Sequence, residues 1–329
     1  MIDGYSDRNS DCRSTWCSDG SNEQRKKCLV GSPLDIFENN FMQGTHSLTQ
    51  GNYFSGMPRG GLIVGEDKKA HVSFMQLDFL SRELPPRDLD VLLDIEARRY
   101  MTSGQVCRLR FGTASTPGSA QRIANRVLNR LKGHGLIVPL QRRIGGVRGG
   151  SSEYIWALTP AGYRLLHLEE DDLTRKLNFE PSQRFAEHTL AVTELDMQLR
   201  SIQGVSVMEA QFEPDNWRDC GKNRLKPDYY AITSVGEYED YWFFEIDLAT
   251  VKPFRVVEKC MQYQEYYYSG VEQHKTGIFP RVVWVAPDKK RQEDLRRYIR
   301  EGKTIQLKDL FVVITMDELE HLIREGVTP

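Results

Sequence analysis

Residues 241–250, YWFFEIDLAT, decide the fold of the second half of the chain, because they combine a strand-like alternation with two carboxylates. In a β-strand, side chains two residues apart point to the same face of the sheet. One face of this predicted strand is apolar and consists of Trp242, Phe244, Ile246 and Leu248. The opposite face carries Phe243, Glu245 and Asp247. Carboxylates buried among aromatic side chains are costly unless a cation or hydrogen-bond donor meets them, so this strand marks a candidate site.

A neighbouring strand is predicted over residues 226–234, KPDYYAITS, and it opens with Pro227 and Asp228. If the two strands form a hairpin, Asp228 approaches the face that carries Glu245 and Asp247. Three converging carboxylates suit a hard divalent cation such as Mg²⁺ or Mn²⁺, which prefers oxygen ligands. Such an ion activates water and stabilises the charge that develops on a phosphoryl group. The sequence therefore predicts a metal site formed by these three acids.

The elements around these strands indicate an α/β domain with a mixed central sheet over residues 182–329. A helix is predicted before the strands, over residues 185–202, and a first strand over 205–213. Helical and strand patterns then alternate to the end of the chain, at residues 254–270, 281–287, 289–301, 311–316 and 317–325.

Charge is segregated in the first half of the chain, although the net charge of the whole protein is only −2. No Asp or Glu occurs between Glu96 and Glu153. The basic residues of this window are Arg98, Arg99, Arg108, Arg110, Arg122, Arg126, Arg130, Lys132, Arg142, Arg143 and Arg148. A charge run is often just a solvated face, but such faces normally interleave both signs. The missing acids favour a polyanion as partner.

Helical patterns at residues 85–99, 102–111 and 119–135 precede a predicted hairpin with a basic, glycine-rich tip at 144–152. A loop with Pro117 and Gly118 separates the second and third helices, and a fourth helix covers 159–168. This order resembles a winged helix-turn-helix, whose recognition helix enters the major groove and whose wing contacts phosphates. The resemblance implies DNA contacts from Arg122, Asn125, Arg126, Asn129, Arg130, Arg142, Arg143 and Arg148. A winged helix used for protein contacts is the alternative.

Four regions follow from these patterns: a polar, disordered tail over 1–75, the winged helix over 76–170, a linker over 171–181, and the α/β domain over 182–329. The longest apolar runs are far shorter than the ~20 residues of a membrane-spanning helix. The N-terminus has no basic start or apolar core, so a secretory signal is not expected. Six cysteines without a CxxC pair favour neither a disulfide scaffold nor zinc, and Cys12, Cys17 and Cys28 lack histidine partners. A cytoplasmic protein is expected.

The segments PDYY and FFEID resemble the PD-(D/E)XK, or restriction-endonuclease-like, fold. Asp228 supplies the Asp of the PD pair and Glu245 the second acid, but Asp247 stands where that family usually has lysine. The resemblance implies a positive charge near the scissile phosphate. The residues that would supply it are Lys252, Arg255 or Lys259, with Lys226 a weaker candidate. Glu194 occupies a position where such nucleases often add an acid, and His188 lies near it but is more simply explained as a satisfied polar residue.

The whole chain resembles the replication-relaxation family of plasmid and conjugative-element proteins and the MobC-type relaxases. The segments HTLAVTEL, KPDYYA and FFEIDLATVKPFRVVEKCMQY carry this resemblance. It implies binding of double-stranded DNA at an origin-like site and metal-dependent nicking or relaxation, with other plasmid replication or transfer proteins as further partners. Asp228, Glu245 and Asp247 would be the metal ligands, and Lys259 or Lys252 would hold the phosphate.

Three alternatives to this activity remain open. The missing lysine favours the first alternative, a non-catalytic DNA-binding accessory factor. The second is a transcription regulator whose second domain binds a ligand or a partner, and the third is a tyrosine nucleophile. Some relaxases attack through tyrosine, and a cluster occurs at Tyr263, Tyr266, Tyr267 and Tyr268. On a helix the first three share one face, which is more typical of packing against a sheet.

Overall fold

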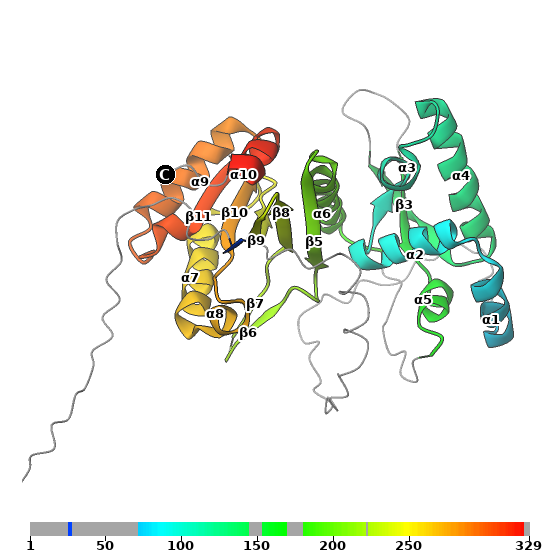
Figure 1. Ribbon diagram of the computed structural model, residues 1–329, viewed down its shortest axis with the longest axis horizontal. Helices are drawn as coiled ribbons and strands as arrows, with labels where there is room; N and C mark the ends of the chain where they lie inside the picture. The colour runs from blue at the N-terminus through cyan, green and yellow to red at the C-terminus, as the bar shows by residue number, and fades with distance from the viewer. Residues whose placement is uncertain (1–25, 28–71, 145–152, 170–179, 222, 326–329) are drawn as a thin grey trace, which may run out of the picture.

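The protein has a mixed α/β fold, seen in a computed structural model that describes residues 26–27, 72–144, 153–169, 180–221 and 223–325. Elements α1 to α5 gather at one end of the molecule, and a central sheet with its helices forms the other end (Figure 1). Arg148 and the cysteines at positions 12, 17 and 28 lie outside the described residues, as do the side chains of Arg142 and Arg143. Most of the predicted tail and linker lies outside them too.

The N-terminal group contains five helices and a small sheet. Its elements are α1 (Phe74–Glu83), α2 (Pro86–Arg98), β2 (Met101–Thr102), α3 (Ser103–Phe111), α4 (Pro117–Gly133), β3 (Ile137–Ile144), β4 (Glu153–Leu158) and α5 (Pro160–Leu166). The three strands pair in the order β2-β4-β3. The four helices and the hairpin predicted for this region are confirmed in type and order. Helix α1 begins in the last two residues of the predicted tail, in a segment whose sequence pattern was ambiguous.

Local capping explains where these helices begin. The Thr102 hydroxyl accepts a hydrogen bond from the Gln105 N–H, and the Gln105 side chain accepts one from the Thr102 N–H. This reciprocal capping box starts α3, and Ser73 starts α1 in the same way. The predicted loop at Pro117 and Gly118 is wrong, because both residues belong to α4. Thr116 caps this helix and proline takes its first position, where no N–H is needed.

The remaining elements build the second half of the molecule. They are α6 (Gln183–Ser201), β5 (Val205–Phe212), β6 (Arg218–Cys220), β7 (Asn223–Leu225), β8 (Tyr229–Val235), β9 (Tyr238–Ile246), α7 (Pro253–Ser269), α8 (Val271–Thr276), β10 (Arg281–Ala286), α9 (Lys289–Glu301), β11 (Phe311–Thr315) and α10 (Leu319–Glu325). The central sheet has the order β11-β10-β9-β8-β5, and the short strand β1 (Lys26–Lys27) pairs with β9. Strands β5, β8 and β9 are antiparallel, whereas β9, β10 and β11 are parallel. The predicted mixed sheet is therefore confirmed.

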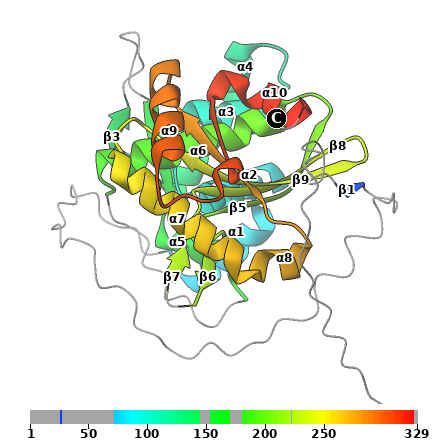
Figure 2. The ribbon, with the colours of Figure 1, turned by 90° about the vertical axis from the view of Figure 1, so that its left-hand side faces the viewer.

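Helices cover both faces of this sheet. Side chains of α7 and α9 pack on one face, where Phe243, Val282 and Trp284 are buried. Helices α6 and α10 pack on the other face, over Trp242, Phe244 and other apolar side chains. Figure 2 looks from the end of the molecule that carries α7 and α9. The alternation predicted for residues 242–246 is confirmed, although β9 ends at Ile246 and the backbone turns through a left-handed residue, Ala249.

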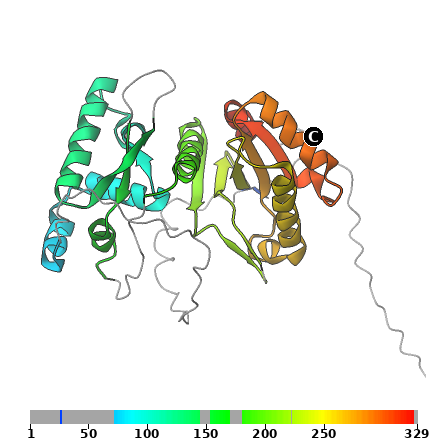
Figure 3. The same cartoon turned by 180° about the vertical axis from the view of Figure 1, so that it is seen from behind.

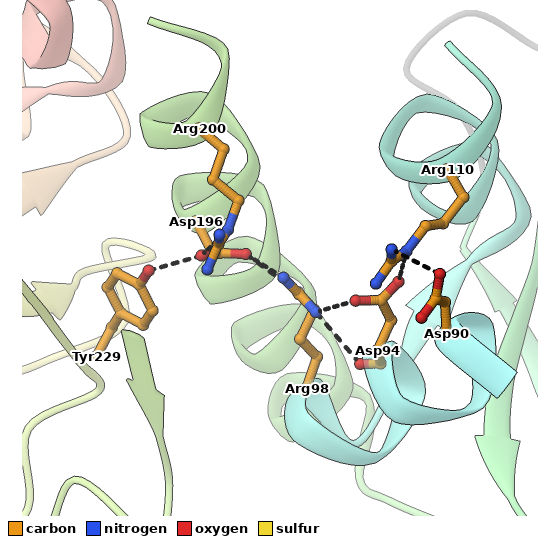
Figure 4. Close-up of polar contacts among 7 residues, drawn as sticks. All are labelled: Asp90, Asp94, Arg98, Arg110, Asp196, Arg200 and Tyr229. Atoms are coloured by element: carbon orange, nitrogen blue, oxygen red, sulfur yellow. Dashed lines mark hydrogen bonds and ion pairs between the residues drawn. The ribbon is translucent and has the colours of Figure 1, made fainter. Parts of the chain in front are cut away.

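Helix α6 lies between the sheet and the N-terminal group (Figure 3), and a buried network of charged side chains crosses this contact (Figure 4). Arg98 of α2 pairs with Asp94 of its own helix at 2.9 Å and with Asp196 of α6. Asp196 also accepts hydrogen bonds from Arg200 at 2.8 Å and from the Tyr229 hydroxyl at 2.6 Å. The side chains of Arg98 and Asp196 are at most 5% exposed, so both charges depend on these partners.

Candidate active site

A cavity of about 520 Å³ opens where α6, α7 and the carboxyl end of β9 meet. Its polar lining includes His188 from α6, Asp228 from the start of β8, Glu245 from β9 and Lys259 from α7. Apolar side chains form much of the rest: Phe185, Ile246, Leu248, Val251 and Trp284. The structure therefore brings together two of the predicted acids, Asp228 and Glu245, and two of the predicted cations, Arg255 and Lys259.

Asp228 is held from two sides. One of its carboxylate oxygens accepts a hydrogen bond of 2.7 Å from the backbone N–H of Ile246, and the other lies 3.1 Å from Nε2 of His188. Burial alone would raise the pKa of Asp228, but the hydrogen bond and charge of His188, together with Lys259, outweigh burial and lower it. The side chain thus stays ionised and fixed in direction.

Glu245 lies next to Asp228, and its negative charge is less well balanced by neighbouring groups. Its Oε1 accepts a hydrogen bond of 2.6 Å from the Tyr263 hydroxyl and lies 3.1 Å from Nζ of Lys259. Burial raises the pKa of Glu245 to about 7; the charge of Asp228 adds to this rise, while Lys259 and Tyr263 offset part of it. An additional cation in the cavity would therefore stabilise the ionised form of Glu245.

Lys259 reaches the cavity from the second turn of α7. Its Nζ donates a hydrogen bond of 2.6 Å to the backbone carbonyl of Lys226, which precedes the PD pair. Burial lowers the pKa of Lys259, but Glu245 and Asp228 more than offset this and raise it, so the amine is a fixed positive charge. Of the other predicted cations, Arg255 also lines the cavity, whereas Lys252 is exposed at the cap of α7 and does not line it.

His188 is the cavity residue that the sequence did not assign to the site. It lies on α6 with a side chain 30% exposed. Burial lowers the pKa of His188, whereas its hydrogen bond to Asp228 and the charges of Asp228 and Glu245 raise it by more. The segment HTLAVTEL placed it near the predicted site, but nothing in the sequence showed that it would pair with Asp228.

Two predicted acids lie elsewhere. Asp247 is buried and pairs with Arg291 of α9, so the three carboxylates do not converge as expected. Glu194 forms a two-point ion pair with Arg108 of α3, with distances of 2.7 and 2.5 Å, on the contact with the N-terminal group. Within the described residues, no cluster of three or more His, Cys, Asp or Glu side chains is arranged to hold a metal ion.

The tyrosine cluster belongs to the core. Tyr263 and Tyr266 are almost fully buried between α7 and the sheet, and they donate hydrogen bonds to Glu245 and Glu272. Tyr267 is partly buried on the same face, whereas Tyr268 is 58% exposed. The predicted packing role of the first three is confirmed.

The polar side of α4 keeps only part of its predicted positive charge. Arg122, Arg126 and Asn129 are exposed, and the two arginines form no ion pair with any residue in the described ranges. Arg130 instead pairs with the buried Asp88 of α2, with Nε at 2.8 Å from the carboxylate. Asn125 is exposed and accepts a hydrogen bond of 3.0 Å from Gln121. Of the three arginines on this side, Arg122 and Arg126 are therefore the two without an ion pair among the described residues.

A family model described as replication-relaxation matches residues 92–282, which is more than half of the chain and runs from α2 to β10. The chain belongs to the replication-relaxation family. This match contains Asp228, Glu245 and Lys259, and it spans both the N-terminal group and the cavity. Neither the comparison with curated proteins nor that with solved structures found a match. Among the described helices of this family member, none is long and apolar enough to span a membrane.

Proposed function

We propose that this protein binds plasmid or mobile-element DNA and nicks or relaxes it with a divalent metal ion. The observation that supports this proposal is the meeting of Asp228, Glu245 and Lys259 in one cavity. Two acids and a lysine at those positions are what a PD-(D/E)XK-like site requires. The lysine comes from α7, which compensates for Asp247 at the usual lysine position.

The donor set fits Mg²⁺ or Mn²⁺. Mg²⁺ commonly binds through one or two carboxylates and keeps several waters, so two acids suffice. The raised pKa of Glu245 is a second sign of fit, because it reflects a buried carboxylate with too little positive charge nearby. Asp228 and Glu245 would hold the ion, which supplies an activated water and stabilises charge on the phosphoryl group when bound.

The remaining cavity residues fix the direction of the two acids and balance their negative charge. His188 and the Ile246 N–H fix the direction of Asp228, and Tyr263 fixes Glu245. Lys259 places a positive charge beside Glu245, where it can hold a phosphate oxygen. The proposed DNA-binding part is the winged helix formed by α2 to α5, with Arg122 and Arg126 toward the DNA.

Incubation with supercoiled plasmid tests the activity. The wild-type protein should convert the plasmid to open circles with Mg²⁺ or Mn²⁺ and not with EDTA. Glu245→Gln should remove conversion, while Asp78→Asn, which alters an exposed acid of α1, should keep it. Conversion in EDTA, or equal conversion by Glu245→Gln, would contradict a metal-dependent activity at this cavity.

A non-catalytic accessory protein is the second candidate. Two observations favour it: Asp247 stands in the usual lysine position, and no three acids or histidines among the described residues form a metal-binding group. This candidate predicts specific DNA binding with no conversion of plasmid under any of these conditions.

A further inference from the structure

The acids of the cavity lie deep. The side chain of Glu245 is 7% exposed and that of Asp228 is 14% exposed, whereas those of His188 and Lys259 are 30% and 21% exposed. A phosphate that meets both acids must therefore enter the cavity instead of resting on an open surface.

The walls of the cavity suit a base or sugar better than a phosphate. Phe185, Ile246, Leu248 and Val251 line it beside the polar floor, together with Trp284. Such side chains bind flat, apolar surfaces through stacking and van der Waals contact, which suits a base or a sugar. A mostly apolar pocket with a few convergent polar groups is typical of a small-ligand site.

Positive charge is also present among the lining residues. Arg184 is exposed and forms no ion pair with any residue of the described ranges. Arg255, also exposed, forms an ion pair of 2.6 Å with Glu258, another lining residue, and lies over the ring of Phe254. These groups can hold phosphates on either side of a nucleotide that occupies the cavity.

The volume restricts what can enter. Sites that enclose one small ligand have volumes of ~300–1,000 Å³, and the cavity, at about 520 Å³, lies in this range. It can therefore hold one nucleotide, whereas a base pair joined to its two backbones is a much larger object. We propose that the cavity receives a single nucleotide unstacked from its strand, so that the substrate is single-stranded or locally opened DNA.

This inference rests on the proposed function, because it assumes that the DNA meets Asp228 and Glu245. It adds a requirement that a surface site would not have: the target nucleotide must leave the stack. Enzymes that act on extruded nucleotides prefer mismatched, bulged or single-stranded targets, in which unstacking costs less. The full-length protein should share this preference.

Binding in EDTA separates the inference from catalysis. Fluorescence anisotropy would compare three DNAs of one sequence: a matched duplex, the same duplex with a one-nucleotide bulge, and the single strand. We expect the bulged duplex to bind about tenfold more tightly than the matched duplex, because it keeps the grooves for the winged helix and also presents an unstacked nucleotide. The single strand has no groove for the winged helix and reports binding by the cavity alone. Thr250→Trp, at an exposed lining position, should abolish this preference, whereas Val271→Trp, on α8 and away from the cavity, should keep it.

A second measurement does not depend on any variant. 2-Aminopurine at the bulge, which brightens when it leaves the base stack, should change its fluorescence on binding of the wild-type protein and stay unchanged in the matched duplex. Equal affinity for the bulged and matched duplexes, or a preference that survives Thr250→Trp in a folded protein, would overturn the inference. Plasmid nicking without this preference overturns the inference alone, while a preference in EDTA without nicking in Mg²⁺ overturns only the proposed activity.

Discussion

Two clusters of buried charge lie side by side in this protein, and they differ in how well their charges are paired. In the network between α2 and α6, Asp196 meets Arg98, Arg200 and the Tyr229 hydroxyl. One residue before Tyr229, Asp228 opens the other cluster, in which burial raises the pKa of Glu245 to about 7. The first cluster joins two parts of the molecule, whereas the second leaves a carboxylate that another cation would stabilise. Incomplete pairing of buried acids is typical of functional sites.

The largest predicted effect comes from breaking the paired cluster. Asp196→Ala should lower the free energy of unfolding by about 3–5 kcal/mol, because it leaves Arg98 buried with one partner fewer and Tyr229 without an acceptor. Urea titration would measure this. Asp78→Ala is the matched control, since its pair with Arg82 is exposed and should cost about 0–1 kcal/mol. A similar small loss in both variants would show that the network does not stabilise the contact.

The second cluster should make the free energy of unfolding depend on pH. The pKa of Glu245 is raised from 4.5 to about 7, so the folded protein keeps a proton that the unfolded chain releases. Stability should therefore fall as pH rises from about 5 to about 7.5 and then level off. Relative to Glu245→Gln, the wild-type protein should lose about 1–3 kcal/mol across this window. Parallel stability curves for the two proteins, recorded without metal, would contradict the raised pKa.

Helix α4 allows the same comparison with smaller expected effects, between Arg130, which is paired with an acid, and Arg126, which has no ion pair among the described residues. Arg130 is paired with Asp88, so Arg130→Ala should cost about 1–2 kcal/mol of stability, because it leaves that buried acid with only the longer ion pair of 3.7 Å to Arg87. Arg126→Ala should leave stability unchanged and weaken DNA binding. If the arginine contacts a phosphate, the slope of log affinity against log salt concentration should become shallower by about one. Binding isotherms at several salt concentrations check this. Unchanged DNA affinity in an Arg122→Ala, Arg126→Ala double variant would remove α4 from the interface.

Periodicity made most of the fold predictable from the sequence. The apolar stripe of α4 and the alternation of residues 242–246 depend on neighbours in the chain, and both are confirmed. The placing of Asp228 beside β9 followed from the hairpin between β8 and β9. Local signals also placed the start of α3 at Thr102 or Ser103 and that of α5 at Thr159, and the structure has Thr102 and Thr159 as the caps.

Long-range charge pairing was not predictable in the same way. The segment between Glu96 and Glu153 has no acid, yet Arg98, Arg108 and Arg130 each meet one from outside it. Asp247 shares a strand face with Glu245 but pairs with Arg291, which lies 44 residues further along the chain. Spacing along the sequence does not show such partners. The free positive surface and the group of cavity acids are therefore both smaller than the sequence indicated.

The central claim is that Asp228 and Glu245, and not the other predicted acids, form the metal site. Isothermal titration of Mn²⁺ into the wild-type protein, Asp228→Asn and Glu194→Gln tests it directly. The last variant is a matched control, because Glu194 was predicted for the site but lies against Arg108. The account predicts binding by the wild-type protein and Glu194→Gln, and loss of binding by Asp228→Asn. Equal binding by all three proteins, or binding by none even with DNA present, would contradict it.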